Sequence, residues 1–257
     1  MTSAFSLARR LRAGETVYSG WCGLPYPIVA ELVGREGFPA VTLDGQHGLW
    51  DTASVLAAVA AIRQAGAAPI VRIPVGEFAS VSRALDFGAE GIIAPIINTP
   101  ADARAYASFA KYPPIGERSW GPHRATMLAD MPDQKVYLRE ANSLTVTFAM
   151  IETRTALENV EAIAATPGID ALFLGPADLS IALSNGANVD AMASDVDREI
   201  DRITAAASKA GKIMGAYCHT AERAVALAKR GVRFLAVGSD MGFLRAGAAA
   251  ALKTLKE

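Results

Sequence analysis

Short apolar runs and longer helical patterns alternate along the whole chain. The apolar runs are rich in Val, Ile and Phe. They predict eight strands: Thr16–Cys22, Ala40–Asp44, Pro69–Ile73, Gly91–Pro95, Leu144–Glu152, Ile169–Gly175, Lys212–Cys218 and Arg233–Gly238. Apolar residues at helical spacing predict helices over Ile28–Arg35, Ala53–Ala65, Phe78–Phe87, Ala101–Ala110, Ala156–Ala164, Ala191–Ala210, Ala221–Lys229 and Phe243–Lys256. Glycines stand where many of these helices should end before the next strand, which supports the boundaries.

The alternation of strands and helices indicates an α/β fold. Nearly continuous apolar strands are typical of a parallel sheet that helices cover on its faces, and eight strand–helix units close into a (β/α)8 TIM barrel. An open doubly wound sheet is the competing arrangement, but no G-x-G-x-x-G sequence follows the first strand. No linker marks a second domain, so we expect residues 1–257 to form one domain.

One segment interrupts the alternation. The stretch from Tyr112 to Asn142 contains several Pro and Gly residues and one short helical pattern around Gln134–Glu140. Long connections of this kind are usually functional. We therefore expect a functional loop or lid here.

Composition and charge exclude several classes of partner. The net charge is −1 and Lys and Arg form no cluster, so we expect no nucleic-acid partner. No apolar stretch approaches the ~18 residues that span a bilayer, and no signal peptide opens the chain, so we expect no membrane association. Cys22 and Cys218 have neither metal-binding spacing nor a disulfide framework. They predict small buried thiols in a reduced, cytoplasmic protein.

Ionisable residues collect at the carboxyl ends of the predicted strands, where barrels of this type carry their chemistry. Each has an ordinary structural explanation when taken alone, such as helix capping or a surface loop. Their joint position on or beside one rim favours a functional site. The residues are His47 in the sequence Asp44-Gly45-Gln46-His47-Gly48, Arg72, Glu152, Asp178 in Gly175-Pro176-Ala177-Asp178, and Asp86 just before the fourth strand.

The residue types at this rim predict enolate chemistry. Glu152 and Asp178 make a sparse oxygen site that suits Mg²⁺ or Mn²⁺. Arg72 offers a positive fork to an oxyanion, and His47 can act as general base or acid near neutral pH. The Gly175–Asp178 turn opens a helix whose N–H groups can bind a carboxylate. Together these groups predict a metal-dependent carbon–carbon lyase acting on a 2-oxo acid.

A Schiff-base lysine is the other route that aldolases use. No lysine stands at the carboxyl end of a predicted strand, and Lys212 begins a strand at the opposite rim. The sequence therefore favours the metal-dependent route.

The chain resembles the HpcH/HpaI aldolase family, the class II pyruvate aldolases that act on 4-hydroxy-2-oxo acids. The resemblance runs from about Trp21 to the C-terminus and rests on seven motifs in order. These are LDGQHG (Leu43–Gly48), VRIP (Val71–Pro74), LDFGAE (Leu85–Glu90), YPPIGERS (Tyr112–Ser119), MIET (Met150–Thr153), GIDALFLGPADLS (Gly168–Ser180) and FLAVGSD (Phe234–Asp240).

The resemblance implies an architecture and a set of roles. The fold would be a TIM barrel of the phosphoenolpyruvate/pyruvate superfamily type with a swapped C-terminal helix, assembled as a homohexamer, a trimer of dimers. Glu152 and Asp178 would hold Mg²⁺ or Mn²⁺, with Co²⁺ also accepted. His47 would act as acid and base in a dyad with Asp86, and Arg72 would stabilise the enolate.

The resemblance also implies the substrate contacts. The backbone at Ala177 and Asp178 matches the site for the pyruvate carboxylate. The other expected substrate contacts are Gly175, Pro176, Trp21, Gln46 and Ser119.

Three departures from the family pattern concern the substrates. Gln46 stands where many members have Glu, and Met150 stands where many have a Gln that contacts the substrate. The loss of that amide favours a donor beyond pyruvate, such as hydroxypyruvate. The stretch from Ser119 to His123 also differs, and we expect it to shape the aldehyde end of the pocket together with a neighbouring subunit.

Three other functions stay open at this point. The same enolate forms when a 2-oxo acid such as oxaloacetate loses CO₂, so a decarboxylase is the nearest alternative. A CoA-thioester lyase is a second, although such chains are typically longer. A non-catalytic barrel that binds a carboxylic acid is a third, although a binding protein has no need of a base such as His47.

Overall fold

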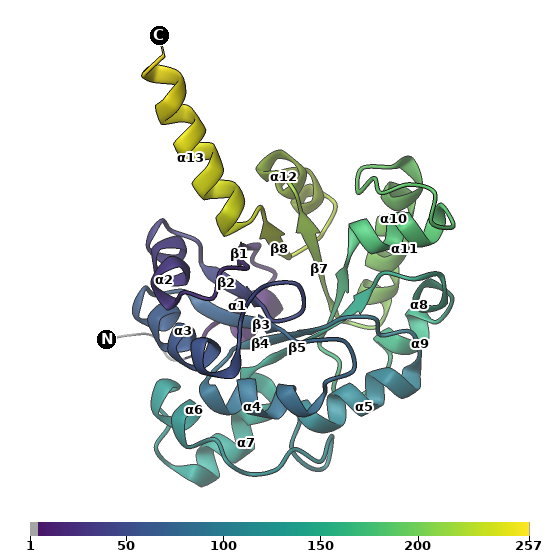
Figure 1. Cartoon of the computed structure of the whole chain (residues 1–257). Coiled ribbons are helices and arrows are strands. Elements are labelled where there is room, and N and C mark those ends of the chain that lie inside the picture. The colour runs from purple at the N-terminus through teal and green to yellow at the C-terminus, as the bar shows by residue number, and fades with distance from the viewer. Residues whose placement is uncertain (1–4, 257) are drawn as a thin grey trace.

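The computed structural model describes residues 5–256, and its centre is a closed barrel of eight parallel strands (Figure 1). Each strand pairs with the next along the chain, and β8 returns to pair with β1. The strands are β1 Val17–Cys22, β2 Ala40–Asp44, β3 Ala68–Arg72, β4 Gly91–Ala94, β5 Val146–Ile151, β6 Ala171–Leu174, β7 Ile213–Cys218 and β8 Phe234–Val237. The predicted (β/α)8 barrel is confirmed, with strand ends shifted by one or two residues.

Helices surround the barrel. They are α1 Leu7–Arg12, α2 Pro27–Arg35, α3 Thr52–Gln64, α4 Ala79–Phe87, α5 Pro100–Ala110, α6 His123–Leu128, α7 Gln134–Leu144, α8 Arg154–Glu158, α9 Val160–Ala164, α10 Pro176–Leu183, α11 Ser194–Lys209, α12 Ala221–Lys229 and α13 Asp240–Thr254. None of the helices between residues 5 and 256 is both long and apolar enough to cross a bilayer.

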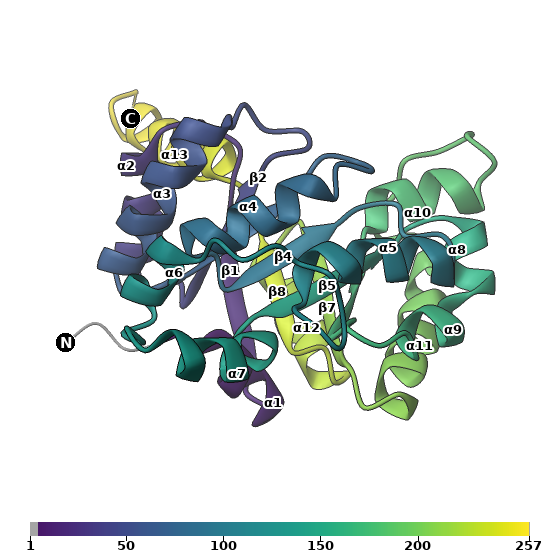
Figure 2. The same ribbon diagram turned by 90° about the horizontal axis from the view of Figure 1, so that it is seen from below.

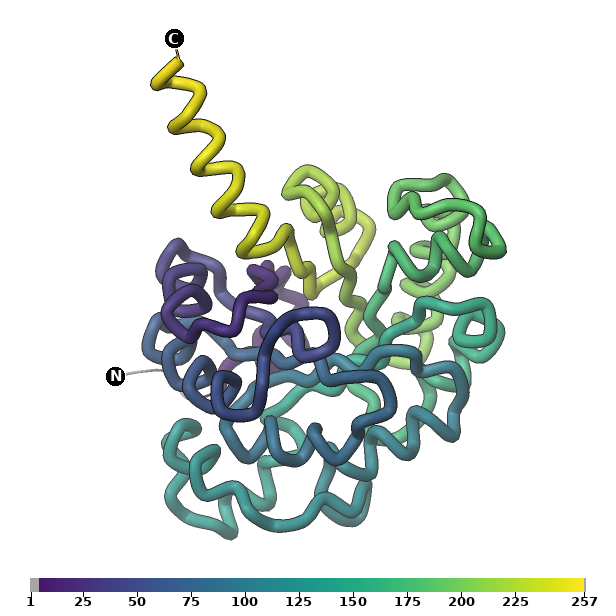
Figure 3. Tube along the Cα trace, viewed as in Figure 1, coloured from purple at the N-terminus to yellow at the C-terminus, as the bar shows by residue number. Residues whose placement is uncertain are grey.

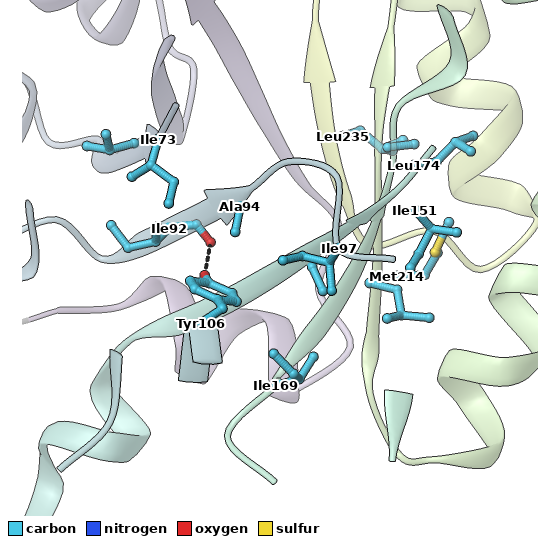
Figure 4. Packing of buried hydrophobic residues seen from close by; sticks show 14 of the residues in the cluster. Ile73, Ile92, Ala94, Ile97, Tyr106, Ile151, Ile169, Leu174, Met214 and Leu235 are labelled. Carbon is cyan, nitrogen blue, oxygen red and sulfur yellow. Dashed lines mark hydrogen bonds between the residues drawn. The ribbon is translucent and has the colours of Figure 1, made fainter. Parts of the chain in front are cut away.

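The strands are apolar because they are buried on both faces, as in other parallel barrels. Side chains that point outward pack against the helices, and Figure 4 shows part of this layer. There the hydroxyl of Tyr106 on α5 donates a hydrogen bond of 2.7 Å to the carbonyl oxygen of Ile92 on β4. Side chains that point inward fill the barrel, where the rings of Phe148, Phe173 and Phe234 lie against one another.

Helix α1 closes the amino end of the barrel, and Figure 2 shows it at the lower end of β1. Its side chains Leu7 and Leu11 join the apolar cluster inside the barrel. The carboxylate of Glu90 accepts hydrogen bonds from the backbone N–H groups of Ser6 and Leu7, and it pairs with Arg63. This helix was not among the elements that the sequence predicted.

The segment between α5 and β5 carries α6 and α7 and also lies at the amino end. Helix α7 packs against α1, and the segment builds a small apolar core with Phe5, Tyr112 and Tyr137. The segment is therefore part of the packed structure. Within one chain it does not cover the carboxyl ends of the strands, so the expectation of a lid is not met there.

Helix α13 leaves the barrel and projects from it (Figure 3). Its first residue, Asp240, is buried and accepts hydrogen bonds from the backbone N–H groups of Gly23 and Leu24. From Met241 onward its residues are exposed, including Leu244 and Leu252. Near its start, the ring of Phe243 stacks on that of Phe38 with centroids 5.9 Å apart, whereas Leu244 and Leu252 further along are exposed to solvent.

Candidate active site

A cavity of about 240 Å³ lies at the carboxyl ends of the strands. Side chains from six strands or the loops after them converge on it, which is where barrels of this type bind ligands. The lining residues are Trp21, Asp44, His47, Arg72, Met150, Glu152, Phe173, Gly175, Pro176, Ala177, Asp178, Tyr217 and His219. Its size suits a small substrate.

Asp44 ties together two parts of the cavity wall. It ends β2, and its Oδ1 accepts hydrogen bonds of 3.1 Å from the backbone N–H groups of Gln46 and His47. Both of its oxygens also accept hydrogen bonds from Arg72, which ends β3: Nε lies 2.8 Å from Oδ1 and Nη2 lies 2.7 Å from Oδ2. One carboxylate thus fixes the loop that carries His47 and the orientation of Arg72.

The same contacts set the charge state of Asp44. Burial raises its pKa, but the hydrogen bonds and positive charge of Arg72 outweigh burial, so the net pKa lies below the ordinary value. Arg72 lies over the Trp21 ring, 4.8 Å from its centroid. Its remaining nitrogen, Nη1, makes no hydrogen bond to the described residues, which leaves a charged donor for a ligand in the cavity.

Glu152 follows β5 and is 1% exposed. Its Oε1 accepts a hydrogen bond of 2.8 Å from the backbone N–H of Ile96, whereas its Oε2 is buried with no partner among the described residues. Burial, with a smaller contribution from the negative charge of Asp178, raises the pKa of Glu152 to about 7. A buried carboxylate with one unsatisfied oxygen is costly to keep ionised unless a cation or a proton meets it.

These residues fit a divalent cation. Glu152 and Asp178 line the same cavity, and two carboxylates leave room for the water and chelating substrate that Mg²⁺ retains. Gly175 lies directly against the carboxylate, because a Cβ built there would stand 2.1 Å from Oε2 of Glu152. The described residues contain no group of three or more His, Cys, Asp or Glu side chains with metal-binding geometry.

The amino end of α10 borders the cavity beside these acids. Gly175 is its N-cap and Pro176 is its first residue, which has no N–H. The next backbone N–H groups, those of Ala177 and Asp178, have no acceptor within the helix. Such groups at a helix amino end favour an anion.

The structure brings most of the predicted site residues together. Trp21, His47, Arg72, Glu152 and the stretch from Gly175 to Asp178 all line the cavity. Gln46 lies beside it in the His47 loop, with its Oε1 buried and unpartnered among the described residues. Ser119 lies outside the cavity, on the segment at the amino end.

Asp86 also lies outside the cavity. It sits near the end of α4, just ahead of the amino end of β4, and is not among the residues that line the cavity. Its Oδ1 accepts a hydrogen bond of 2.6 Å from Nη2 of Arg118. The dyad with His47 is therefore not formed within one chain.

Four lining residues received no role from the sequence: Asp44, Phe173, Tyr217 and His219. Asp44 carried a usable signal, because it ends a strand and opens the His47 loop. Phe173 and Tyr217 looked like ordinary apolar strand residues. His219 follows the end of β7, but it lies far in sequence from Glu152 and Asp178, so its position alone did not connect it with them.

Comparison of the chain with known proteins agrees with the geometry of the cavity. Residues 20–246 match the model of the HpcH/HpaI aldolase/citrate lyase family. The chain belongs to this family. Aldolases and citrate lyases, the enzymes in the family's description, are carbon–carbon lyases. This is the enzyme class that the rim residues predicted.

Individual HpcH/HpaI relatives cover nearly the whole chain. A hydroxypyruvate/pyruvate aldolase of Rhizorhabdus wittichii is 37% identical over 91% of this chain and 92% of its own. A 5-keto-4-deoxy-D-glucarate aldolase of Salmonella arizonae is 34% identical over 96% of this chain and 95% of its own. The crystal structure of an HpcH/HpaI aldolase from Desulfitobacterium hafniense superposes with a TM-score of 0.89 at 28% identity, covering 99% of this chain and 98% of that one.

Proposed function

We propose that this chain is a class II aldolase that joins pyruvate, or a 3-substituted pyruvate such as hydroxypyruvate, to an aldehyde. The product is a 4-hydroxy-2-oxo acid, and the reaction is reversible. One observation carries the proposal: the two acids, an oriented arginine, a histidine and a helix amino end all meet in one cavity. The aldolase names of the relatives support the same reaction.

The metal is part of the proposal. Mg²⁺ or Mn²⁺, with Co²⁺ also accepted, would be held by Glu152 and Asp178 and would supply Lewis acidity to a chelating 2-oxo acid. The unpartnered Oε2 of Glu152 supports this assignment.

The side chains and backbone of the chain would divide the remaining work. The N–H groups of Ala177 and Asp178 bind the carboxylate of the 2-oxo acid, and Nη1 of Arg72 stabilises negative charge on its keto oxygen. In the cleavage direction His47 accepts the proton of the 4-hydroxyl group as the C3–C4 bond breaks. The bonding electrons then form the enolate, the aldehyde leaves, and C3 of the enolate takes up a proton.

The choice of donor substrate depends on Met150, in the cavity wall beside the proposed metal site. Met150 lines the cavity there, and its thioether is a weak hydrogen-bond acceptor that cannot donate. A flexible side chain at this position can adapt to a substituent on C3 of the donor. This supports acceptance of hydroxypyruvate as well as pyruvate.

We also propose that the chain assembles as a homohexamer. The exposed apolar residues of α13 support docking on another copy, as in a swapped-helix dimer within a trimer of dimers. Asp86, Arg118 and Ser119 form a second group outside the cavity of their own chain, which supports a role at the site of a neighbouring subunit.

The cellular location is a further expectation. Cys22 and Cys218 are buried and unpaired, which confirms the reading of them as small core side chains. Burial raises the pKa of the Cys218 thiol to about 12, so it stays protonated and unreactive. Buried free thiols and soluble substrates support a cytoplasmic enzyme.

The alternatives receive less support. The two relatives from Rhizorhabdus wittichii and Salmonella arizonae, which match over more than nine-tenths of the chain, are named aldolases, not decarboxylases or thioester lyases. A carboxylate-binding protein would have no use for a histidine in the cavity beside the acids.

Metal removal tests the proposal. Dialysis against EDTA should abolish aldol cleavage of a 4-hydroxy-2-oxo acid, and Mn²⁺, Co²⁺ or Mg²⁺ should restore it. The variant His47→Ala should lose roughly 10²- to 10⁴-fold in turnover while it still binds Mn²⁺ in a calorimeter. Full turnover in metal-free protein would overturn the metal assignment, and undiminished turnover of His47→Ala would overturn the role of the histidine.

A further inference from the structure

A second cavity lies at the amino ends of β6, β7 and β8, on the side of the barrel opposite to the proposed active site. Its volume is about 380 Å³. Helix α1 contributes Leu11 and Arg12 to its wall, and helix α11 contributes Thr204, Ala207 and Ser208. Barrels of this type place their chemistry at the carboxyl ends of the strands, so a ligand in this amino-end cavity would be bound rather than converted.

Positive charge prevails in the amino-end cavity. Arg12, Lys212 and Arg233 line it, and Asp170 is the one acid among the described lining residues. The Asp170 carboxylate is already paired: Oδ2 lies 2.6 Å from Nζ of the buried Lys111, and Oδ1 lies 3.4 Å from Nη2 of Arg12. The charges of Lys212 and Arg233 are therefore left without a counter-ion among residues 5–256.

Lys212 stands between α11 and β7, and its ammonium group makes no hydrogen bond or ion pair with a described residue. A lysine at the end of a helix often binds the last carbonyl groups of that helix. Here backbone N–H groups take that place. The N–H of Gly211 donates to the carbonyl oxygen of Ser208 at 3.0 Å, and the N–H of Lys212 itself donates to that of Ala207 at 2.8 Å. The ammonium group is thus available to a ligand.

Further donors line the same cavity. Arg233 uses Nη1 to donate to the carbonyl oxygens of Ala228 and Val232, which leaves its Nε and Nη2 without an acceptor in the described part of the chain. The hydroxyl oxygen of Thr204 is buried there without a hydrogen-bond partner, a state that costs free energy. Threonine in a helix has two accessible rotamers, so this hydroxyl can turn to a ligand. Ser208, one turn later on α11, adds an exposed hydroxyl.

We propose that the amino-end cavity binds a phosphate monoester of a small metabolite. A phosphate monoester carries a charge approaching −2 near neutral pH and three strong acceptor oxygens. Two unpaired cations, Lys212 and Arg233, match the charge, and they match the oxygens together with the hydroxyls of Thr204 and Ser208. A ligand at this place would bridge α11 to the loop between α12 and β8, which carries Arg233.

The organic part of the ligand meets an apolar wall. Leu11, Ile213 and Met214 line the cavity together with the donors. A phosphate group alone fills only a small part of a volume of about 380 Å³, so a short carbon skeleton fits with it. Small-molecule sites commonly combine a few polar groups with apolar walls in this way. The proposal is independent of the proposed aldolase function, because the two cavities lie at opposite ends of the barrel.

Calorimetric titration of the full chain tests this site. The probes are glycerol 3-phosphate, inorganic phosphate and glycerol, with Mg²⁺ and excess pyruvate present throughout to occupy the carboxyl-end cavity. The variant Lys212→Ala removes a cation, and Thr204→Val removes a hydroxyl while it keeps the shape of the side chain. The matched control is Lys209→Ala, since Lys209 is an exposed lysine at the end of α11 outside the cavity.

Glycerol 3-phosphate should bind the parent protein and raise its Tm, because a ligand that binds only the folded state stabilises it. Loss of a hydrogen bond to a charged group should weaken its affinity about 10-fold in Lys212→Ala and roughly 3- to 10-fold in Thr204→Val. Inorganic phosphate should bind more weakly than glycerol 3-phosphate, and glycerol should not bind. Lys209→Ala should match the parent.

The proposal is overturned if glycerol 3-phosphate does not bind the parent, or if both cavity variants bind it with parental affinity. An equal loss in Lys209→Ala would reduce the effect to general surface charge and would also refute the site. Inorganic phosphate that binds as tightly as the monoester would refute the organic part of the ligand. Urea unfolding of each variant checks that the fold is intact, and either cavity variant alone decides the outcome if the other does not fold.

Discussion

Asp44 shows how one carboxylate organises the site. It holds the backbone of the His47 loop through Oδ1, and it holds the Arg72 guanidinium through both oxygens. The glycine at position 48 allows this tight loop, since a Cβ there would stand 2.3 Å from the carbonyl oxygen of Asp44. His47 and Arg72, the proposed base and oxyanion donor, are thus placed relative to each other by a residue that need not touch the substrate.

Replacement of Asp44 by Asn should lower aldol activity without unfolding the barrel. The amide keeps the shape but loses the charge and one acceptor, so Arg72 and His47 shift relative to the enolate. Misplacement on the order of 1 Å costs about 100-fold in rate, and we expect a fall of that order in kcat/KM. Steady-state kinetics would measure it, with Asp130→Asn on an exposed turn as the control; a parental rate in Asp44→Asn would refute the positioning role.

The Asp44–Arg72 pair should also make stability depend on pH in the acid range. The pKa of Asp44 is lowered in the folded state, so the pair contributes stability above the unfolded pKa of about 4. That contribution is lost as the pH falls toward the folded pKa.

Urea unfolding at pH 7, 5 and 3.5 should show this. The difference in unfolding free energy between the parent and Asp44→Asn should shrink at the lowest pH. A difference that stays constant over this range would show that Asp44 does not carry the dependence.

The site residues that could be identified from the sequence are those at or just after the ends of strands. Arg72 ends β3, Glu152 directly follows β5, and Asp178 lies in the first turn of the helix after β6. A parallel barrel brings all such strand ends to one rim. His219 also follows a strand, but without a neighbouring acid nothing in the sequence connected it with the site. Asp86 came from the family resemblance, and the fold of one chain leaves it outside the cavity.

At the level of elements, the strands were predictable and the short helices were not. Strands buried on both faces leave an unbroken apolar run that marks their position. Helices α1 and α6 have six residues each and were not predicted, and the predicted helix Ala156–Ala164 is divided into the five-residue helices α8 and α9. Helices of this length are not stable by themselves and form because tertiary contacts hold them, so local sequence gives little sign of them.

Helix α1 should contribute to global stability through its apolar side chains. Leu7 is 1% exposed inside the barrel end, and its replacement by Ala should lower the unfolding free energy by about 2–5 kcal/mol. Leu138→Ala on α7 is the matched control, because that side chain is 46% exposed and should change stability by less than about 0.5 kcal/mol. Equal effects of the two variants in chemical denaturation would mean that α1 does not seal the barrel.

At the scale of the whole molecule, the site of one chain looks incomplete with respect to the family pattern. The cavity contains His47, whereas Asp86 and Ser119 lie elsewhere on the same chain. The exposed helix α13 gives a means by which another copy can dock. Both observations support a site that two subunits share.

Complementation between inactive variants tests this arrangement. His47→Ala and Asp86→Ala should each be weakly active alone, and co-expression should produce mixed assemblies in which some sites have both residues intact. We expect activity of the mixed assembly well above that of either variant. Activity equal to the average of the two variants would mean that His47 and Asp86 do not act together across subunits.

The two ends of the barrel have different uses. Helix α1 closes the amino end, and the cavity opens at the carboxyl end. A solid support or a fusion partner joined ahead of α1 therefore lies on the side away from the cavity mouth. Attachment through that end should leave diffusion of the 2-oxo acid and the aldehyde unobstructed, which makes it the natural anchor for an immobilised catalyst.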